Sequence, residues 1–300
     1  MKSKFWKMLG ILVLFLLVSY GLSTLLKFEA DIKDKIVIIP IQGTITTGSG
    51  LFNQEVVDST TIVDYIKQAD QEKSIKAIIL EIDSPGGTVV ASEEIARAVK
   101  QAKKPVVSYI RETGASGAYW VASASDKIVA NPLSITGSIG VYSGYLEFSG
   151  LFDKYGVTYV DLKSGKYKDT GTPFKELSDD ERKILENKLK IIHSIFISDV
   201  AKNRNLTLDM TQKLSTGIYY LGLEAYEFGL VDYLGDKDKA IEIAKELSNI
   251  TDADLVRYET KNTFLDLFSQ LSSSAFFNIG RGVASEIEFN SKSEAMDILA

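Results

Sequence analysis

Two apolar segments of this chain each end in a turn rich in glycine. The segment KAIILEI at 76–82 has the length and composition of a buried strand, and it leads into DSPGG at 83–87. A second buried strand is predicted over 105–110, and TGASG at 113–117 follows it and opens a helix of small residues over 114–124. Strands that are apolar on both faces need helices on both sides of their sheet. The pattern therefore predicts an α/β domain with a largely buried sheet.

The spacing of apolar residues predicts the other elements. We expect strands over 35–45, 127–130 and 157–162, and helices over 57–68, 92–102, 178–203, 223–228 and 237–247. Ser92 and Asp236 are predicted as N-caps of two of these helices. Ser178 and Glu181 have the spacing of a capping box, which predicts a firm start for the long helix that follows.

An uncharged apolar run lies near the N-terminus. Residues 8–26 would span about 28 Å as a helix at about 1.5 Å per residue, which matches a hydrocarbon core of about 30 Å. Lysines precede the run, so the positive-inside rule places the N-terminus in the cytoplasm and the remaining chain outside. A cleaved signal peptide is the alternative, but its apolar region is usually shorter and ends in an A-x-A-like site. We therefore expect a retained single-pass type II anchor in the cell membrane.

These patterns divide the chain into three parts. We expect residues 1–27 to form the cytoplasmic N-terminus and the transmembrane anchor, and residues 28–250 to form one folded domain outside the cell membrane. The patterning is weaker over 251–300, which predicts a C-terminal extension that is partly mobile.

Composition excludes several classes of function. The chain has no Cys and one His, His193, which removes thiol nucleophiles, Cys-based zinc sites and motifs that need two histidines. Residues 28–300 hold 30 basic and 40 acidic side chains, and so acidic a body argues against a nucleic-acid partner. No metal and no cofactor is implied.

Ser116 is the candidate nucleophile. It lies in the first turn of the predicted helix at 114–124, where backbone N–H groups favour developing negative charge, as in an oxyanion hole. A lone serine at such a position is more often an N-cap or a packing residue. The G-x-S-x-G motif of α/β-hydrolases does not match, because Ala118 stands where its last glycine belongs.

A serine nucleophile needs a base, and lysine is the remaining choice. His193 lies deep in the long helix, where a satisfied or surface histidine is the simpler interpretation. A buried lysine becomes a base when its pKa falls from about 10.4 towards about 7 to 8. Lys166 and Lys168 both lie in the loop SGKYKDTGTPF, and spacing alone does not choose between them.

Five ordered strings resemble the signal peptide peptidase A family of membrane-anchored serine proteases. They are EIDSPGG at 81–87, TGASGAYWVASASDKIVANP at 113–132, ITGSIGV at 135–141, SGKYKDTGTPF at 164–174 and EFGLVDYLG at 227–235. The resemblance covers about residues 35–250 and implies a ClpP/crotonase-like fold. By this resemblance Ser116 is the nucleophile, Lys168 is the general base, and Ser138 orients the lysine. The same resemblance assigns the backbone N–H groups of Gly87 and Gly117 to the oxyanion hole.

The chain resembles the short form of the family, which has one catalytic unit. The resemblance implies a ring-like homo-oligomer in which neighbouring protomers share each Ser/Lys dyad. It also implies peptide substrates, namely remnant signal peptides and other unfolded or membrane-proximal peptides. One departure lies at 216–222, where Ile218 and Leu221 replace an Arg and a Thr of the family string G-R-x-Y-T-G.

Two other functions remain open at this point. A crotonase-like acyl-CoA enzyme would share the fold and would also use glycine-turn N–H groups as an oxyanion hole, but it would bind CoA and form no adduct at Ser116. A non-catalytic membrane-anchored oligomeric scaffold would keep the fold and lose the chemistry.

Overall fold

The computed structural model describes residues 10–21, 33–48 and 56–258. The chain divides into two units, Met1–Tyr258 and Glu259–Ala300, and the second unit lies outside the described residues. The expectation of a partly mobile C-terminal extension therefore falls largely on residues that the structure does not describe.

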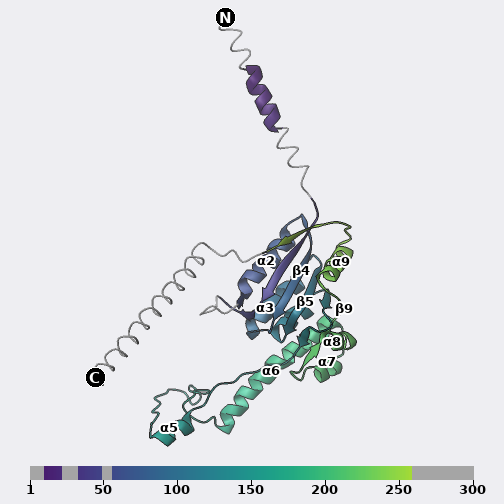
Figure 1. Ribbon diagram of the computed structural model, residues 1–300. Coiled ribbons are helices and arrows are strands. Elements are labelled where there is room, and N and C mark those ends of the chain that lie inside the picture. The colour runs from purple at the N-terminus through teal and green to yellow at the C-terminus, as the bar shows by residue number, and fades with distance from the viewer. Residues whose placement is uncertain (1–9, 22–32, 49–55, 259–300) are drawn as a thin grey trace, which may run out of the picture. The chain divides into compact units, whose positions relative to one another are not determined.

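An eight-stranded sheet forms the centre of the fold (Figure 1). Its main path runs in the order β10-β1-β4-β5-β6-β9, with β7 paired to β5 and β8 paired to β7. Every pairing in this sheet is parallel except β7 with β8. The strands are β1 (Lys35–Gln42), β4 (Ile75–Ser84), β5 (Val106–Ala115), β6 (Lys127–Ala130), β7 (Ile135–Gly137), β8 (Tyr219–Leu221), β9 (Tyr233–Leu234) and β10 (Asp254–Arg257), and β2 (Thr44–Thr46) pairs separately with β3 (Val56–Asp58).

Helices cover both faces of the sheet, as the apolar strands require. The larger buried cluster joins one face to α2, α3, α4 and α6, and a smaller cluster joins the other face to α9. The helices are α2 (Ser59–Gln71), α3 (Val89–Gln101), α4 (Gly117–Ser123), α5 (Ser149–Tyr155), α6 (Asp179–Arg204), α7 (Leu208–Leu214), α8 (Gly222–Glu227) and α9 (Lys237–Ser248). The predicted α/β class is confirmed.

The capping predictions had mixed outcomes. The capping box at the start of α6 is present, because Ser178 accepts from the N–H of Glu181 and Glu181 accepts from the N–H of Ser178. Asp236 caps α9 as predicted. The prediction for Ser92 is wrong, since α3 begins earlier with Thr88 as its N-cap and Ser92 is buried within the helix. Residues 157–162 form no strand, because no neighbouring strand offers hydrogen bonds to them.

Residues 141–178 form a long excursion, the arm, which carries α5 and leads into α6. Figure 1 shows α5 well away from the central sheet, and no residue of the arm is buried. Asp169 anchors the arm by accepting from Lys163 at 2.6 Å and pairing with Lys175 at 2.8 Å. Lys175 also donates to Glu181 on α6 at 2.9 Å. The arm is thus held to the first turn of α6 by charge rather than by a core of its own.

Residues 10–21, the described part of the predicted anchor, are helical, and every one of them is exposed. Within the ranges that the structure describes, no helix combines the length and the hydropathy needed to cross a bilayer. At the other end of the unit, β10 pairs with β1 over 254–257, so the sheet continues past residue 250, where we expected the domain to end.

Candidate active site

Ser116 lies where β5 passes into α4, at the carboxyl edge of the parallel sheet. Its backbone has φ 54° and ψ −124°, a conformation that non-glycine residues adopt rarely. Its N–H donates to the carbonyl of Gly137 at 2.8 Å, and its carbonyl accepts from the N–H of Trp120 at 3.0 Å. None of the described residues forms a hydrogen bond with its hydroxyl. Ser116 is at the N-cap position of α4, but its side chain does not cap the helix. Strain of this kind is concentrated at functional sites, so Ser116 is the first residue of the candidate site.

The turn after β4 packs directly against the turn that carries Ser116. Gly86 has φ 99°, and a Cβ there would lie 2.7 Å from the nitrogen of Gly117 and 3.0 Å from the Cβ of Ser116. Gly87 pairs with Ile45 as an isolated bridge, and a Cβ on Gly87 would lie 1.9 Å from the carbonyl oxygen of Ile45. Only glycine fits at these two positions, which is why the DSPGG segment brings its backbone so close to Ser116.

Two backbone N–H groups beside Ser116 are unused. The nitrogen of Gly87 lies 3.3 Å from the position that a Cβ of Gly117 would take. Among the described residues, none accepts a hydrogen bond from the N–H of Gly87 or of Gly117. Free N–H groups near one nucleophile can bind an oxyanion, which is the arrangement expected from the two glycine turns.

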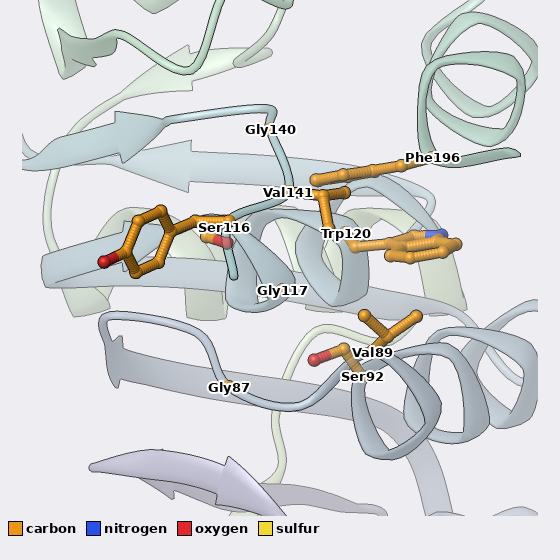
Figure 2. A pocket seen from close by; sticks show the side chains of 10 residues that line it. Gly87, Val89, Ser92, Ser116, Gly117, Trp120, Gly140, Val141 and Phe196 are labelled. Atoms are coloured by element: carbon orange, nitrogen blue, oxygen red, sulfur yellow. The ribbon is translucent and has the colours of Figure 1, made fainter. Parts of the chain in front are cut away.

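A pocket of about 230 Å³ adjoins Ser116. Figure 2 shows the rings of Trp120 and Phe196 lying against each other on one side, with Val89 and Ser92 on the other. The two rings stack with centroids 4.6 Å apart. Among the residues that the structure describes, none that lines the pocket is charged, and its walls are Gly87, Val89, Ser92, Ser116, Gly117, Trp120, Gly140, Val141, Tyr142 and Phe196. The walls suit an apolar side chain.

Ser138 follows β7 and reaches the same region through the backbone. The carbonyl of its neighbour Gly137 accepts from the N–H of Ser116, which ties the segment of Ser138 to the turn of Ser116. Ser138 also has a positive φ of 49°. Its N–H donates to the carbonyl of Ile218 at 3.0 Å, and its hydroxyl donates to the carbonyl of Gly217 at 3.1 Å. Gly217 and Ile218 belong to the segment 216–222, where the sequence departs from the family string G-R-x-Y-T-G. This segment therefore holds Ser138 in place through two hydrogen bonds.

Lys168 is not brought to Ser116 within one chain. It is exposed on the arm, two residues before Thr170, whose hydroxyl donates to Glu181 at 3.0 Å. Phe196 lines the pocket fifteen residues further along α6, which is about 22 Å at about 1.5 Å per residue. The sequence places Lys168 in the same loop as Lys166, and the structure leaves both away from the pocket.

The two lysines of this loop have different surroundings. The Nζ of Lys166 lies 3.6 Å from Asp180 and 4.8 Å from the ring centre of Tyr167. Among the described residues, nothing pairs with the Nζ of Lys168. Lys168 is therefore the one of the two whose amine is free to act elsewhere.

The single histidine of the chain is not aimed at Ser116. Its Nε2 lies 3.3 Å from the carbonyl oxygen of Ile139, and the ring is half-buried on α6. Its contact is with the backbone of the segment after β7, which fits the expectation of a satisfied His193. In the described ranges no group of acidic or histidine side chains could hold a metal ion.

Sequence reasoning missed the aromatic walls of the pocket. Trp120 lies one helical turn after Ser116, a spacing that places both on one side of α4, and this signal was available. Phe196 lies within the long helix that the sequence predicts over 178–203, a prediction that gives it no place in the site. Its place beside Trp120 depends on how α6 packs on α4, which no local pattern records.

Known proteins share both the sequence and the fold. The model of peptidase family S49 matches residues 98–251, and the model of the NfeD1b N-terminal domain matches residues 35–145. A protein of Methanocaldococcus jannaschii with the provisional name of a protease is 35% identical over 79% of this chain and 76% of its own length. A protein of Enterococcus faecium, provisionally named signal peptide peptidase SppA, is 36% identical over 78% of this chain and 70% of its own.

Solved structures agree in fold. The 1510-N membrane-bound stomatin-specific protease, solved as a lysine-to-alanine mutant in complex with a substrate peptide, superposes with a TM-score of 0.53 at 17% identity. The matched region covers 80% of this chain and 99% of the chain of the solved structure. The S49 family model covers β5, β7 and the turn that carries Ser116, and two relatives more than 30% identical match over three quarters of this chain. This chain accordingly belongs to peptidase family S49, the family of signal peptide peptidase SppA.

Proposed function

We propose that the protein is a serine endopeptidase in which Ser116 is the nucleophile and Lys168 of a neighbouring copy is the general base. Ser138 orients that lysine, and the N–H groups of Gly87 and Gly117 hold the oxyanion. One observation carries the proposal. The hydroxyl of Ser116, on a strained strand-to-helix junction, has no partner among the described residues and lies beside two free N–H groups at the mouth of an apolar pocket.

The reaction follows from these roles. The Oγ of Ser116 attacks the peptide carbonyl carbon while its proton moves to the neutral Nζ of Lys168, and the carbonyl oxygen gains the negative charge. The peptide C–N bond then breaks, and Lys168 returns the proton to the leaving amine. Water attacks the resulting ester with Lys168 again taking a proton, which it gives to Ser116 as the acid leaves.

The exposed arm supports a site shared between copies. Within one chain the arm holds Lys168 on the order of 20 Å from the pocket, far beyond the reach of its own side chain. Two solved structures that share the fold are a serine-to-alanine and a lysine-to-alanine mutant of one protease, the second with a substrate peptide bound. These two mutants support a serine and a lysine as the catalytic pair here as well.

The pocket and the N-terminal segment support the class of substrate. An uncharged pocket with walls of Trp120, Phe196, Val89 and Val141 takes apolar side chains, which remnant signal peptides supply. Residues 8–26 are proposed as a membrane anchor that keeps the catalytic domain on the outer face, near such peptides. We also assign the sheet and its flanking helices to the ClpP/crotonase-like fold.

An acyl-CoA enzyme fits less well. The phosphates of CoA are usually bound by cationic side chains, and none of the described residues that line the pocket beside Ser116 is cationic. A non-catalytic scaffold would not require a strained backbone conformation or an unpaired hydroxyl at Ser116.

The test uses the full chain in detergent micelles with a fluorogenic apolar peptide. Ser116→Ala and Lys168→Ala are each expected to abolish cleavage, whereas Lys166→Ala is the matched control that keeps it. Light scattering establishes that all variants assemble alike. Mixing the two inactive variants should restore activity at interfaces where an intact Ser116 meets an intact Lys168. Full activity of Lys168→Ala would show that Lys168 is not the general base. A wild-type protein that assembles but never cleaves would favour the non-catalytic scaffold.

A further inference from the structure

Charged side chains on either side of Lys168 in the chain pair with one another. We call them the charge cluster, and its members are Asp161, Lys163, Asp169, Lys175 and Glu181. None of the described residues pairs with Lys168 itself, although Asp169 follows it directly in the sequence. The ion pairs of this loop thus leave out the one lysine to which the proposed chemistry assigns a proton transfer.

Asp169 is the centre of the charge cluster. Its Oδ2 accepts from the Nζ of Lys163 at 2.6 Å and lies 2.8 Å from the Nζ of Lys175. Its side chain is 9% exposed, and its buried Oδ1 has no hydrogen-bond partner among the described residues. Hydrogen bonds from Lys163 and Lys175 hold the pKa of Asp169 well below its usual range. A carboxylate in this position requires cations, because an unpaired charge is costly to bury.

The same two lysines also engage the outer carboxylates of the cluster. The Nζ of Lys163 lies 2.8 Å from Asp161, and the Nζ of Lys175 donates to Glu181 at 2.9 Å. The side chain of Glu181 is 6% exposed, so this pair lies against the first turn of α6 away from solvent. Two ammonium groups therefore satisfy three carboxylates, and no carboxylate of the cluster is left for another lysine.

The other acidic side chains of this region do not pair with Lys168 either. Asp180 lies 3.6 Å from the Nζ of Lys166, and both of those side chains are exposed. Glu176 and Asp179 are exposed and form no ion pair with any described residue. The described walls of the pocket beside Ser116 carry no charge. Lys168 is thus without a carboxylate partner on its own loop, on α6 and among those walls.

We propose that Lys163 and Lys175 hold the neighbouring carboxylates away from Lys168, which leaves its amine free for proton transfer. The proposal rests on the proposed function, because only a lysine that acts as a base has to stay unpaired. A carboxylate that pairs with a lysine favours the charged form of the amine and holds it in one place. Lys163 and Lys175 are positioning residues, since neither touches the reacting atoms.

The double variant Lys163→Met/Lys175→Met of the full chain in micelles tests this role. It removes both charges and keeps two long side chains, so the released carboxylates should capture Lys168. We expect kcat to fall about tenfold or more with little change in KM, because the apolar pocket is untouched. Lys163→Arg/Lys175→Arg keeps both charges and should keep the activity. Lys166→Met is the matched control, a lysine of the same loop whose exposed pair with Asp180 contributes little.

Adding Asp169→Asn separates this role from a merely structural one. The amide of asparagine does not form an ion pair with an ammonium group, so Lys163→Met/Lys175→Met/Asp169→Asn should recover about threefold or more of the lost kcat. If the charge cluster only anchors the arm, the triple variant still lacks that anchor and stays as inactive as the double variant. That result would overturn the proposal.

Limited acylation of the amines measures the state of Lys168 without catalysis. A succinimidyl acetate ester reacts with neutral amines, and mass spectrometry compares Lys168 with Lys166 in the same molecules. The ratio of acylation at Lys168 to that at Lys166 is expected to fall about fivefold in the double methionine variant, once light scattering shows that it assembles like the wild type. Lys163→Met alone, which leaves Lys175 on Asp169, provides the comparison if the double variant does not assemble.

The outcomes distinguish this proposal from the proposed function. An unchanged acylation ratio in the double methionine variant, together with an inactive Lys168→Ala variant, would show that the cluster does not protect Lys168 while the base assignment stands. A lowered ratio with an unchanged kcat would show that the cluster keeps Lys168 unpaired but that Lys168 is not the base.

Discussion

The indole of Trp120 on α4 and the ring of Phe196 on α6 stack with their centroids 4.6 Å apart and their planes inclined by 13°. The contact joins the helix that Ser116 opens to the helix that leads back to the arm. The indole N–H donates to Asp199 at 3.1 Å, which fixes the ring in its plane. One aromatic pair thus shapes the pocket and sets the position of α6 against the sheet.

Phe196→Ala is expected to weaken both the fold and the pocket. The ring is 2% exposed, and removal of a buried aromatic side chain costs about 3–5 kcal/mol of the free energy of unfolding. Urea unfolding of the full chain measures this loss, and Ile195→Ala on the exposed side of α6 is the control, with a change below about 0.5 kcal/mol. A larger pocket should also shift cleavage towards bulkier side chains. An unfolding free energy equal to that of the wild type would show that the stacking does not hold α6.

Gly117→Ala is expected to lower activity strongly. The new Cβ would lie 2.2 Å from the Oγ of Ser92 and 2.9 Å from its Cβ, so the turn that carries the N–H of residue 117 must shift. Loss of one oxyanion donor costs about 100-fold or more in kcat.

Adding Ser92→Ala removes the closer of those two contacts. The double variant should recover part of the kcat that Gly117→Ala loses, and steady-state kinetics with one peptide measures both. A fully active Gly117→Ala variant would contradict the assigned donor.

Ser138→Ala is expected to reduce kcat while KM changes little. The hydroxyl bonds to the carbonyl of Gly217, and a hydrogen bond of about 1.4 kcal/mol that matters in the transition state corresponds to about tenfold in rate. Ser194→Ala is the matched control, because that hydroxyl also donates to a single backbone carbonyl, of Lys190, but on exposed α6. Equal kcat values for the two variants would show that Ser138 does not orient the lysine.

The anchoring of the arm should depend on pH through Glu181. Its hydrogen bonds from Lys175 and from Ser178 lower the pKa of this carboxyl from 4.5 to about 2. A carboxyl with a lowered pKa contributes stability that is complete above its unfolded value and is lost as the pH falls through the folded value. The Tm difference between wild type and Glu181→Gln is therefore expected to be constant above about pH 4.5 and to shrink between about pH 4.5 and 2.

Calorimetry across that pH range measures the difference. Glu186→Gln is the control, an exposed carboxyl on the same helix. A difference for Glu181→Gln that stays constant down to about pH 2 would show that the ionised form of Glu181 does not stabilise the fold.

The sequence by itself determined the elements that local physics controls. The apolar runs at 76–82 and 105–110 had to be buried strands, because nothing else accommodates such residues in so short a segment. The capping box of Ser178 and Glu181 fixed the start of α6, since its hydrogen bonds join residues three apart. The glycines at 86, 87 and 117 marked the turns, and the order of the motifs pointed to Ser116 and the loop of Lys168 as candidate residues.

The meeting of distant segments depends on the folded molecule. In the folded chain Phe196 stacks on Trp120, and Ser138 donates a hydrogen bond to Gly217. The N-cap of α3 is Thr88 rather than the predicted Ser92. The tertiary structure also left Lys168 on an arm about 22 Å along α6 from the pocket, where spacing in the sequence had suggested nothing of the kind. The reason is physical. Helix caps and turns are decided by bonds between near neighbours, whereas the packing of α6 and the position of the arm depend on contacts between residues far apart in the chain, which only the folded molecule brings together.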